Sequence, residues 1–459
     1  MWNGHYYTEV HAQINTCMDN KIKLVYNWIG PNGPIWNTEL PNVLNFSHVA
    51  EGAGPNTSYK VFGDDVSQFF QTHTSDDYEV YPAYSIRHGD PRLFILPFTL
   101  SWRIPFDRYF TGQEGILEFG HIPPHVLQQI RIGNGYILIN HSMEAFMQPV
   151  HLEVLHSYFR STRQCPLHKI IYVTGCVNAE EIYEEYCTTR NIPDTPDTRL
   201  SIVPFHTAFT SFVVNTQEEG AEPDYNTETV PDKLFLMWNR RLRDHRIELA
   251  VNLERHNLVD RSLISFSNEH QDFPGRSAIA QFNYDRLLHV FNIDREYTDR
   301  FISRLPLILD GEENVMQMCQ DYGNVTRSYY QQSLVSIVTE TNFYEKEVSL
   351  TEKSFKPAKE KHPFITAGAK GVLKGMHRLG FRTFSEFWDE SYDDIVDDGE
   401  RMNKIMEIVG QIGTWTPDQI LDFKRRVKPI LEHNYNVIRN ANTDITIKKI
   451  TSIVRKTND

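Results

Sequence analysis

Cysteine is scarce in this chain and is not arranged for disulfides or for a metal. The 459 residues include 5 cysteines, and no two of them form a Cys-x-x-Cys pair. An odd number of scattered cysteines favours reduced thiols in a cytoplasmic protein. Cys176 and Cys187 are too far apart along one predicted helix to favour a zinc site.

Long apolar runs are also missing. No stretch reaches the roughly 18 consecutive apolar residues that a membrane-spanning helix requires. Residues 1–16 are polar and lack the apolar segment of a signal peptide. We therefore predict a cytoplasmic protein without integral membrane contact.

Several well-known catalytic motifs are absent as well. The sequence has no Walker motif, no Gly-x-Gly-x-x-Gly after a strand, no His-Glu-x-x-His and no Gly-x-Ser-x-Gly. These absences argue against nucleotide hydrolases, simple dehydrogenases, zinc proteases and α/β-hydrolases.

Negative charge dominates the composition. Lys and Arg total 46 against 60 Asp and Glu, so the formal net charge is −14 at pH 7. Such a surface does not favour nucleic-acid binding, and an anionic ligand would require a local basic patch. The length and the hydrophobic content of 40% are sufficient for two domains, each with its own core.

Alternating strand and helix patterns begin near residue 123. Apolar runs over 135–139, 169–173 and 200–203 are separated by helical patterns, which predicts a parallel α/β sheet. A similar rhythm follows over 233–238, 262–266, 333–340 and 363–367. The topology of residues 1–110 is left open.

The expected domains follow from these patterns. We predict an N-terminal α/β domain over 1–215 on the acceptor side, an acidic linker over 216–232 and a C-terminal α/β domain over 233–415. A helix over 416–440 is a candidate to return to the N-terminal domain, and a polar tail follows over 441–459.

A basic turn over 239–246 stands out against the net negative charge. It reads Asn-Arg-Arg-Leu-Arg-Asp-His-Arg and lies between a predicted buried strand and a predicted helix. The N-terminus of a helix and arginine side chains both bind phosphate oxygens. The candidates are Arg240, Arg241, Arg243 and Arg246. A solvated turn whose arginines pair with the acidic linker is the alternative.

A second candidate is the sequence Ser-Leu-Thr-Glu-Lys-Ser-Phe-Lys-Pro over 349–357. Ser349 and Glu352 match the capping-box pattern, so Glu352 has a structural interpretation as a helix cap. In the functional interpretation, Glu352 accepts hydrogen bonds from a ribose while Lys353 or Lys356 contacts a phosphate. Glu340 ends the preceding strand and is a candidate for binding a sugar hydroxyl, with a surface acid as the alternative.

Two further groups of residues have chemical potential. His141 and Glu144 follow a predicted strand of the first domain and are candidates for a general base that deprotonates a hydroxyl acceptor. The acids over 389–398 have no ordered metal-ligand spacing, so a solvated acidic face is the favoured interpretation and no metal site is predicted.

These motifs resemble those of a group of glycosyltransferase-like proteins from bacteria and tailed phages. The resemblance covers mainly residues 233–410 and is carried by the basic turn, by Thr-Glu-Lys-x-Phe-x-Pro at 351–357, and by the short motifs at 362–365, 380–384 and 389–393. The Glu-Lys pair is also similar to the donor-binding motif of fucosyltransferases with two Rossmann-like domains, the GT-B fold.

The resemblance implies an α/β fold in which two Rossmann-like domains face a cleft. It implies a metal-independent glycosyltransferase that takes a nucleotide-diphosphate sugar as donor substrate, without a cofactor, and a carbohydrate or other hydroxyl acceptor. If a phage encodes the chain, the expected location is the host cytoplasm. The alternative is a non-catalytic phage protein, structural or carbohydrate-binding, with the same fold. The sugar, the acceptor, the stereochemical outcome and the oligomeric state are not predicted.

Overall fold

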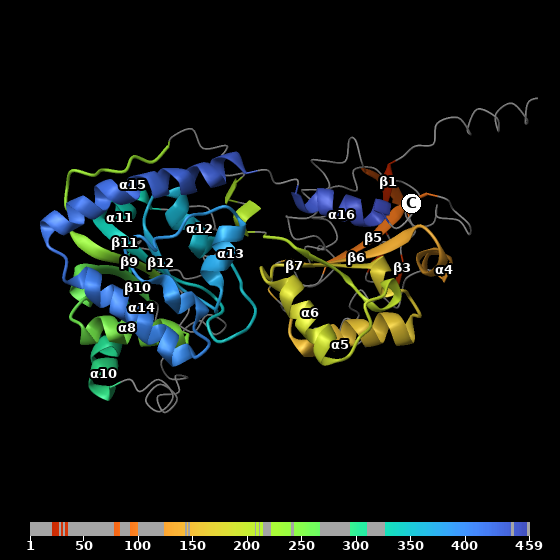
Figure 1. Ribbon diagram of the computed structural model, residues 1–459, viewed down its shortest axis with the longest axis horizontal. Coiled ribbons are helices and arrows are strands. Elements are labelled where there is room, and N and C mark those ends of the chain that lie inside the picture. The colour runs from red at the N-terminus through yellow and green to blue at the C-terminus, as the bar shows by residue number, and fades with distance from the viewer. Residues whose placement is uncertain are drawn as a thin grey trace, which may run out of the picture.

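Two parallel β-sheets, each with its own helices, organise the molecule (Figure 1). The computed structural model describes residues 21–26, 29–30, 33–34, 78–82, 92–99, 124–142, 145, 147–206, 208–210, 212–213, 222–239, 243–266, 294–309, 326–441 and 445–456.

The N-terminal sheet has six strands in the order β4-β1-β5-β6-β7-β8, and every neighbouring pair is parallel. The strands are β1 (Ile22–Tyr26), β4 (Tyr78–Pro82), β5 (Phe94–Thr99), β6 (Gly135–His141), β7 (Ile170–Thr174) and β8 (Ser201–Pro204). A separate antiparallel pair is formed by β2 (Ile29–Gly30) and β3 (Gly33–Pro34).

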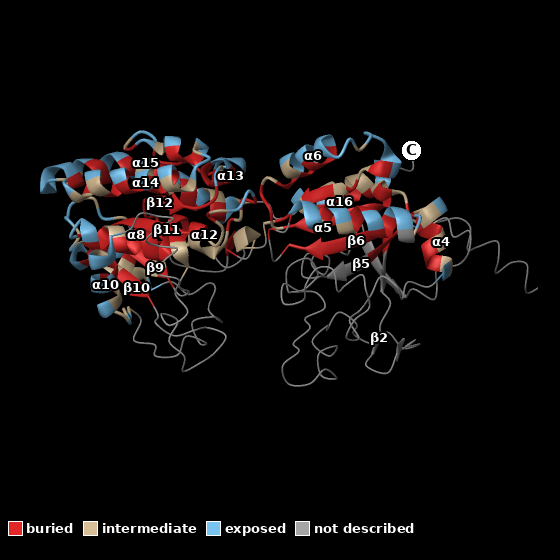
Figure 2. Ribbon diagram, turned by 90° about the horizontal axis from the view of Figure 1, so that it is seen from below, coloured by how far each residue is buried: buried red, intermediate tan, exposed pale blue. Residues whose placement is uncertain are grey.

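Both faces of the N-terminal sheet are covered. Every residue of β6 and β7 is buried, as expected for central strands of a parallel sheet. One face packs against α4 (Pro124–Ile132), α5 (Pro149–His156) and α6 (Ala179–Thr189) through one apolar cluster. A second apolar cluster lies on the opposite face. Figure 2 shows the strand β6 as buried and the helices α5, α6 and α16 as having both buried and exposed residues.

The C-terminal sheet has four parallel strands in the order β10-β9-β11-β12. They are β9 (Lys233–Asn239), β10 (Ser262–Phe266), β11 (Ser333–Thr339) and β12 (Phe364–Ala367). The chain passes from β9 to its neighbour β10 on one side and then continues with β11 and β12 on the other side. The topological switch point therefore lies between β9 and β11.

Helices surround this second sheet, and most of them share one large apolar core with it. The described ones are α8 (Asp244–Arg255), α10 (Arg295–Ser303), α11 (Arg327–Gln332), α12 (Glu352–Lys359), α13 (Val372–Arg378), α14 (Asp398–Gly413) and α15 (Pro417–Asn440). The α/β class with two Rossmann-like domains, predicted from the alternating patterns and the resemblance, is confirmed.

The predictions for the end of the chain need correction. Helix α15 does not return to the N-terminal domain, because its buried side chains, such as Phe423 and Val427, belong to the core of the C-terminal sheet. The segment predicted as a polar tail contains α16 (Ile445–Lys456), which packs Ile447, Ile450 and Val454 on the N-terminal sheet (Figure 1). Its apolar residues are spaced three to four apart, so one face of the helix is apolar despite the polar composition.

The acids near α13 and α14 act as helix caps. Asp393 is 5% exposed and its carboxylate accepts hydrogen bonds from the backbone amides of Leu373 and Lys374 at the start of α13. Asp397 caps α14 by accepting from the backbone amide of Glu400. The expected solvated acidic face is therefore wrong for Asp393, because its carboxylate, about 20 residues further along the chain, satisfies N–H groups in the first turn of α13.

The described residues contain neither a membrane-spanning helix nor a cluster of metal ligands. No helix among them combines the length and the apolar character needed to cross a bilayer. Within the same residues, no group of three or more His, Cys, Asp or Glu side chains is arranged to hold a metal ion.

Candidate functional site

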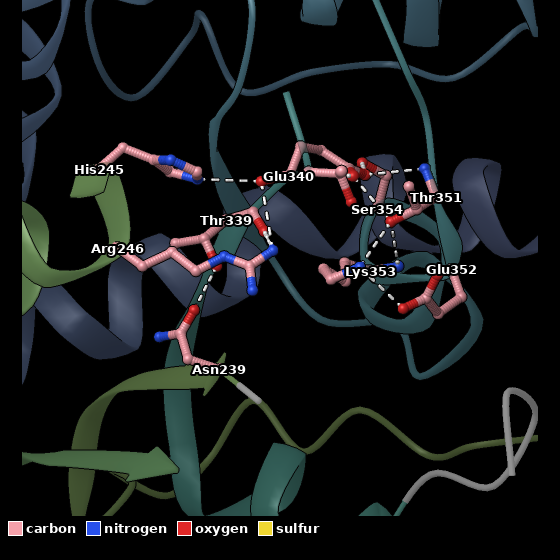
Figure 3. A network of polar contacts seen from close by, with 10 residues as sticks. Asn239, His245, Arg246, Thr339, Glu340, Thr351, Glu352, Lys353 and Ser354 are labelled. Atoms are coloured by element: carbon pink, nitrogen blue, oxygen red, sulfur yellow. Dashed lines mark hydrogen bonds and ion pairs between the residues drawn. The ribbon is translucent and has the colours of Figure 1, made fainter. Parts of the chain in front are cut away.

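The starts of α8 and α12 meet at the carboxyl end of β11. Helix α8 follows β9 and helix α12 follows β11, so both helices begin beside the switch point of the C-terminal sheet. In open parallel sheets, ligands bind outside the carboxyl ends of the strands at such a point. Two helix N-termini there also contribute partial positive charge. This edge of the sheet is the candidate site (Figure 3).

The basic turn contributes directly to this edge. Arg240 and Arg241 lie outside the described residues. Arg243 is the N-cap residue of α8, is half-buried, and donates from Nη1 to the carbonyl of Thr341 at 3.0 Å. Arg246 is buried, and its Nη2 donates to the carbonyls of Thr339 and Glu340 at 3.2 and 3.4 Å. The arginines therefore hold the end of β11 in place, and Arg243 is the less buried of the two.

His245 has a structural place in the same group. Its Nε2 contacts the carbonyl oxygen of Glu340 at 3.0 Å, and its ring stacks on Phe343 with an interplanar angle of 7°. Burial and the nearby charge of Arg246 lower the pKa of His245 to about 3. The imidazole is therefore neutral at physiological pH and donates its Nε2 proton to the carbonyl.

Helix α12 begins differently from the prediction. Its N-cap residue is Thr351, which has extended backbone and accepts a hydrogen bond at its side chain from the amide of Lys353. Ser349 instead forms an antiparallel bridge with Cys176 of the N-terminal domain. The structural alternative, a capping box between Ser349 and Glu352, is wrong, since Glu352 is the first residue of the helix rather than the third. Its carboxylate is thereby released from a capping role.

Glu352 and Lys353 form an ion pair at the start of α12. The Nζ of Lys353 lies 2.8 Å from Oε1 of Glu352, and the two side chains are 22% and 21% exposed. Burial of the Glu352 carboxyl opposes its ionisation, but the ammonium groups of Lys353 and Lys356 outweigh this effect and lower its pKa to about 2. The site thus presents a carboxylate and an ammonium group that both remain partly accessible.

Glu340 follows β11 and is fully buried. Its carboxylate accepts four hydrogen bonds, from the amide of Thr341, the amide and hydroxyl of Thr351, and the hydroxyl of Ser354. The surface-acid alternative is wrong for this residue. All four donors are groups of the protein itself. These hydrogen bonds link the end of β11 to the start of α12 (Figure 3).

The structure therefore brings together most of the candidates from the second domain. Arg243, Arg246, Glu340, Glu352 and Lys353 lie around residues 339–341, although about 100 residues of chain separate the first pair from the last. Asn239 and Thr339 also belong to the group, because the Thr339 hydroxyl donates to the Asn239 side chain at 2.5 Å. Sequence reasoning missed this pair, although both residues end strands that are neighbours in the sheet.

His141, a candidate of the first domain, lies on the other sheet. His141 ends β6, is 3% exposed, and its Nδ1 contacts the Tyr172 hydroxyl at 2.8 Å. Burial and the nearby His151 lower the pKa of His141 to about 3, so its imidazole is neutral and weakly basic. Glu144 lies outside the described residues.

A direct contact joins the two domains next to the Thr-Glu-Lys motif. The side chain of Asn178 accepts from the amide of Val348 at 2.9 Å and donates to the carbonyl of Lys346 at 3.0 Å. The amide of Val177 donates to the carbonyl of Val348 at 2.9 Å. We call residues 176–178 and 346–349 the seam. The sequence shows that Asn178 follows a strand and a Gly-Cys turn, but it does not show that Asn178 contacts Lys346 and Val348.

The fold places the chain among proteins with two Rossmann-like α/β domains. No family model matches the sequence, and no curated protein matches it.

Solved structures with a similar arrangement share 11% sequence identity with this chain. An α,α-trehalose 6-phosphate synthase from Burkholderia multivorans aligns over 82% of this chain and 72% of its own, with a TM-score of 0.41. A sucrose-phosphate synthase from Thermosynechococcus elongatus aligns over 95% and 88%, with a TM-score of 0.39. The N-terminal domain of a trehalose-6-phosphate phosphatase from Candida albicans aligns over 95% and 97%, with a TM-score of 0.40.

Proposed function

We propose that this protein is a glycosyltransferase with a GT-B-like fold that moves a sugar from a nucleotide-diphosphate donor to a hydroxyl acceptor. The observation that carries the proposal is the meeting of two helix starts, with Arg243, Glu352 and Lys353, at the switch point between β9 and β11. Helix N-termini, an arginine and a lysine suit a diphosphate, and a carboxylate suits the hydroxyls of a ribose.

The proposed roles follow from residue type for Arg240 and Arg241, and from accessibility for the residues that the structure describes. Lys353 and Arg243, together with Arg240 and Arg241, stabilise the negative charge that develops on the leaving diphosphate, in a reaction that needs no metal. Glu352 accepts hydrogen bonds from the ribose. Arg246 is buried against carbonyl oxygens, so its proposed contribution is to fix the end of β11 and to add positive potential to the site.

The acceptor side is proposed to lie on the N-terminal domain. A carboxylate or imidazole there removes the proton of the acceptor hydroxyl as the bond to the anomeric carbon forms and the bond to the diphosphate oxygen breaks. Between the two candidates, the burial and the low pKa of His141 favour Glu144 as the base.

Ligand stabilisation tests the proposal. We expect one of uridine, guanosine, adenosine or cytidine diphosphate to raise the melting temperature of the full chain. At 100 times the dissociation constant, a ligand adds about 2.7 kcal/mol of apparent stability. Lys353→Ala removes the accessible ammonium group and is expected to weaken binding of that nucleotide at least tenfold.

The matched control is Lys404→Ala, which removes a partly exposed, ion-paired lysine from α14. This variant is expected to bind the nucleotide as the wild-type protein does. If none of the four diphosphates shifts the melting temperature of the wild-type chain, the glycosyltransferase proposal fails and the non-catalytic alternative is favoured.

A further inference from the structure

We propose that Glu340 is a positioning residue, whose carboxylate sets the geometry of the donor-binding ammonium group of Lys353 through Thr351. The inference rests on the proposed function for the identity of the ligand. It replaces the predicted contact between Glu340 and a sugar hydroxyl with an indirect role, because the carboxylate is fully buried and bonded to the chain itself.

The two carboxylate oxygens of Glu340 have equivalent surroundings. Oε1 accepts from the amide of Thr351 at 3.0 Å and from the hydroxyl of Ser354 at 2.6 Å. Oε2 accepts from the amide of Thr341 at 3.2 Å and from the hydroxyl of Thr351 at 2.7 Å. Each oxygen therefore faces one backbone N–H and one hydroxyl.

This arrangement requires a carboxylate at position 340. A hydroxyl can rotate and become an acceptor, but a backbone N–H can only donate. A glutamine side chain has one oxygen and one NH₂ group, so either orientation directs its NH₂ group at the amide of Thr341 or of Thr351. A buried donor without an acceptor is costly, and the start of α12 would shift to relieve the contact.

The carboxylate reaches the binding group through a chain of hydrogen bonds. The Thr351 hydroxyl donates to Glu340 and accepts from the Nζ of Lys353 at 3.0 Å. The same Nζ lies 2.8 Å from the Glu352 carboxylate. Because the Thr351 hydroxyl has one proton, its donation to Glu340 leaves its lone pairs directed at Lys353. Glu340 thereby fixes both the rotamer of Thr351 and the position of the ammonium group (Figure 3).

The backbone of Glu340 connects the same side chain to the basic turn. Its carbonyl oxygen contacts Nε2 of His245 at 3.0 Å and Nη2 of Arg246 at 3.4 Å. Its amide donates to the carbonyl of Ala367, at the end of β12, at 2.9 Å. One residue thus joins the ends of two neighbouring strands to the starts of α8 and α12, so its side chain cannot move independently of the site.

The test compares nucleotide affinity in two variants of the full chain. Glu340→Gln keeps the shape of the side chain, and Glu360→Gln is the matched control. Glu360 is also a buried carboxylate, at the opposite end of α12, and it pairs with Arg327 at 2.8 Å. Binding of uridine, guanosine, adenosine and cytidine diphosphate is measured by titration calorimetry.

We expect Glu340→Gln to weaken binding of the preferred diphosphate at least tenfold. We expect Glu360→Gln to change this binding less than twofold, although it lowers the melting temperature as much as Glu340→Gln does, or more. A merely structural role for Glu340 would affect melting temperature without this contrast. Equal affinity of Glu340→Gln and wild-type protein would overturn the proposal.

Two further measurements cover a poorly folding variant and an absent ligand. If Glu340→Gln does not fold, Thr351→Val must weaken binding and Thr351→Ser must retain it, since only Ser keeps the bridging hydroxyl. Equal binding by the two Thr351 variants overturns the proposal.

If wild-type protein binds none of the diphosphates, the proposed function fails. Amide exchange over 351–354 then decides: faster exchange in Glu340→Gln supports the positioning role, and unchanged exchange excludes it.

Discussion

Glu248 is a buried acid beside the candidate site whose protonation depends on its surroundings. It lies on α8, is 3% exposed, and its Oε2 has no hydrogen-bond partner among the described residues. Burial, together with the negative charges of Asp398 and Asp244, raises the pKa of Glu248 to about 8. Between its ordinary pKa and this value, the folded protein holds a proton that the unfolded chain releases.

Because of Glu248, the free energy of unfolding should decrease as the pH rises from about 4.5 to 8. We predict that Glu248→Gln, which stays neutral, raises the melting temperature at pH 8 and leaves it nearly unchanged at pH 5. Thermal unfolding at both pH values measures the difference. Glu400→Gln, which removes an exposed carboxylate on α14, is the control. A Glu248→Gln effect of equal size at both pH values would show that burial does not hold the proton.

Arg401 is a second buried ionisable residue next to the site. It lies on α14 and is 2% exposed. Its guanidinium lies 4.5 Å from the centre of the Phe343 ring, and His245 stacks on the same ring. It donates to the carbonyl oxygens of Ile395, Val396 and Phe343 and pairs with Asp398. The residue thus holds the loop after β11 against the start of α14.

We predict that Arg401→Met destabilises the fold by roughly 3 kcal/mol, because buried carbonyls lose their donor and Asp398 loses its partner. Unfolding in urea measures this change. Lys404→Met on the same helix removes an exposed pair and should cost less than about 1 kcal/mol. Equal effects of the two substitutions would contradict the structural role of Arg401.

At the scale of elements, α16 is the part of the chain whose packing role was not predicted from the sequence. Its apolar side chains cover a face of the N-terminal sheet that contains Tyr136, Leu138 and Val173. Helix α15, which precedes it, packs on the C-terminal sheet. The end of the chain therefore contributes a helix to each domain, and α16 completes the core of the first domain from the far end of the sequence.

We predict that Ile450→Ala destabilises the protein by roughly 2–5 kcal/mol, since Ile450 is fully buried and its removal leaves a cavity. Ile445→Ala on the same helix is the matched control, because Ile445 is 69% exposed; its effect should stay within about 0.5 kcal/mol. Equilibrium denaturation of both variants makes the comparison. A small effect at position 450 would mean that α16 does not pack on the sheet in solution.

At the scale of the whole molecule, the seam links the two domains beside the candidate site. Besides the Asn178 contacts, the ion pair between Arg378 and Glu181 spans the same junction. Glu347 is buried there, and burial raises its pKa. Residues 346–349 come shortly before Thr351, so the contacts of the seam lie directly before the start of α12.

We predict that Asn178→Ala loosens this junction, because the amide of Val348 and the carbonyl of Lys346 lose their partners. Faster amide exchange over 346–350, with little change in the strands of either sheet, is the expected result. Glu185→Gln removes the exposed pair with Lys346 from the same junction and should leave the exchange unchanged. Wild-type exchange in Asn178→Ala would show that the side chain does not hold the domains together.

The pattern of residues was sufficient for much of the fold. Continuous apolar runs such as those of β6 and β9, followed by helical spacing, indicated parallel strands with crossover helices, because both faces of such strands are buried. The basic turn and the Thr-Glu-Lys motif were also recognisable as helix starts after strands. The predictions of exposure failed. The polar composition of residues 441–459 gave no sign of the apolar face of α16, and Asp393 caps a helix although it was predicted to face solvent.

By itself, the sequence determined the α/β class, the strand–helix order and the residues of chemical interest in the second domain, since these depend on local periodicity and residue type. The tertiary structure alone decided the strand order, and with it the switch point between β9 and β11 where two helix starts meet. It also separated accessible Lys353 and Glu352 from buried Glu340 and Arg246. Residues about 100 positions apart become partners only when parallel strands pair, and no local pattern encodes that pairing.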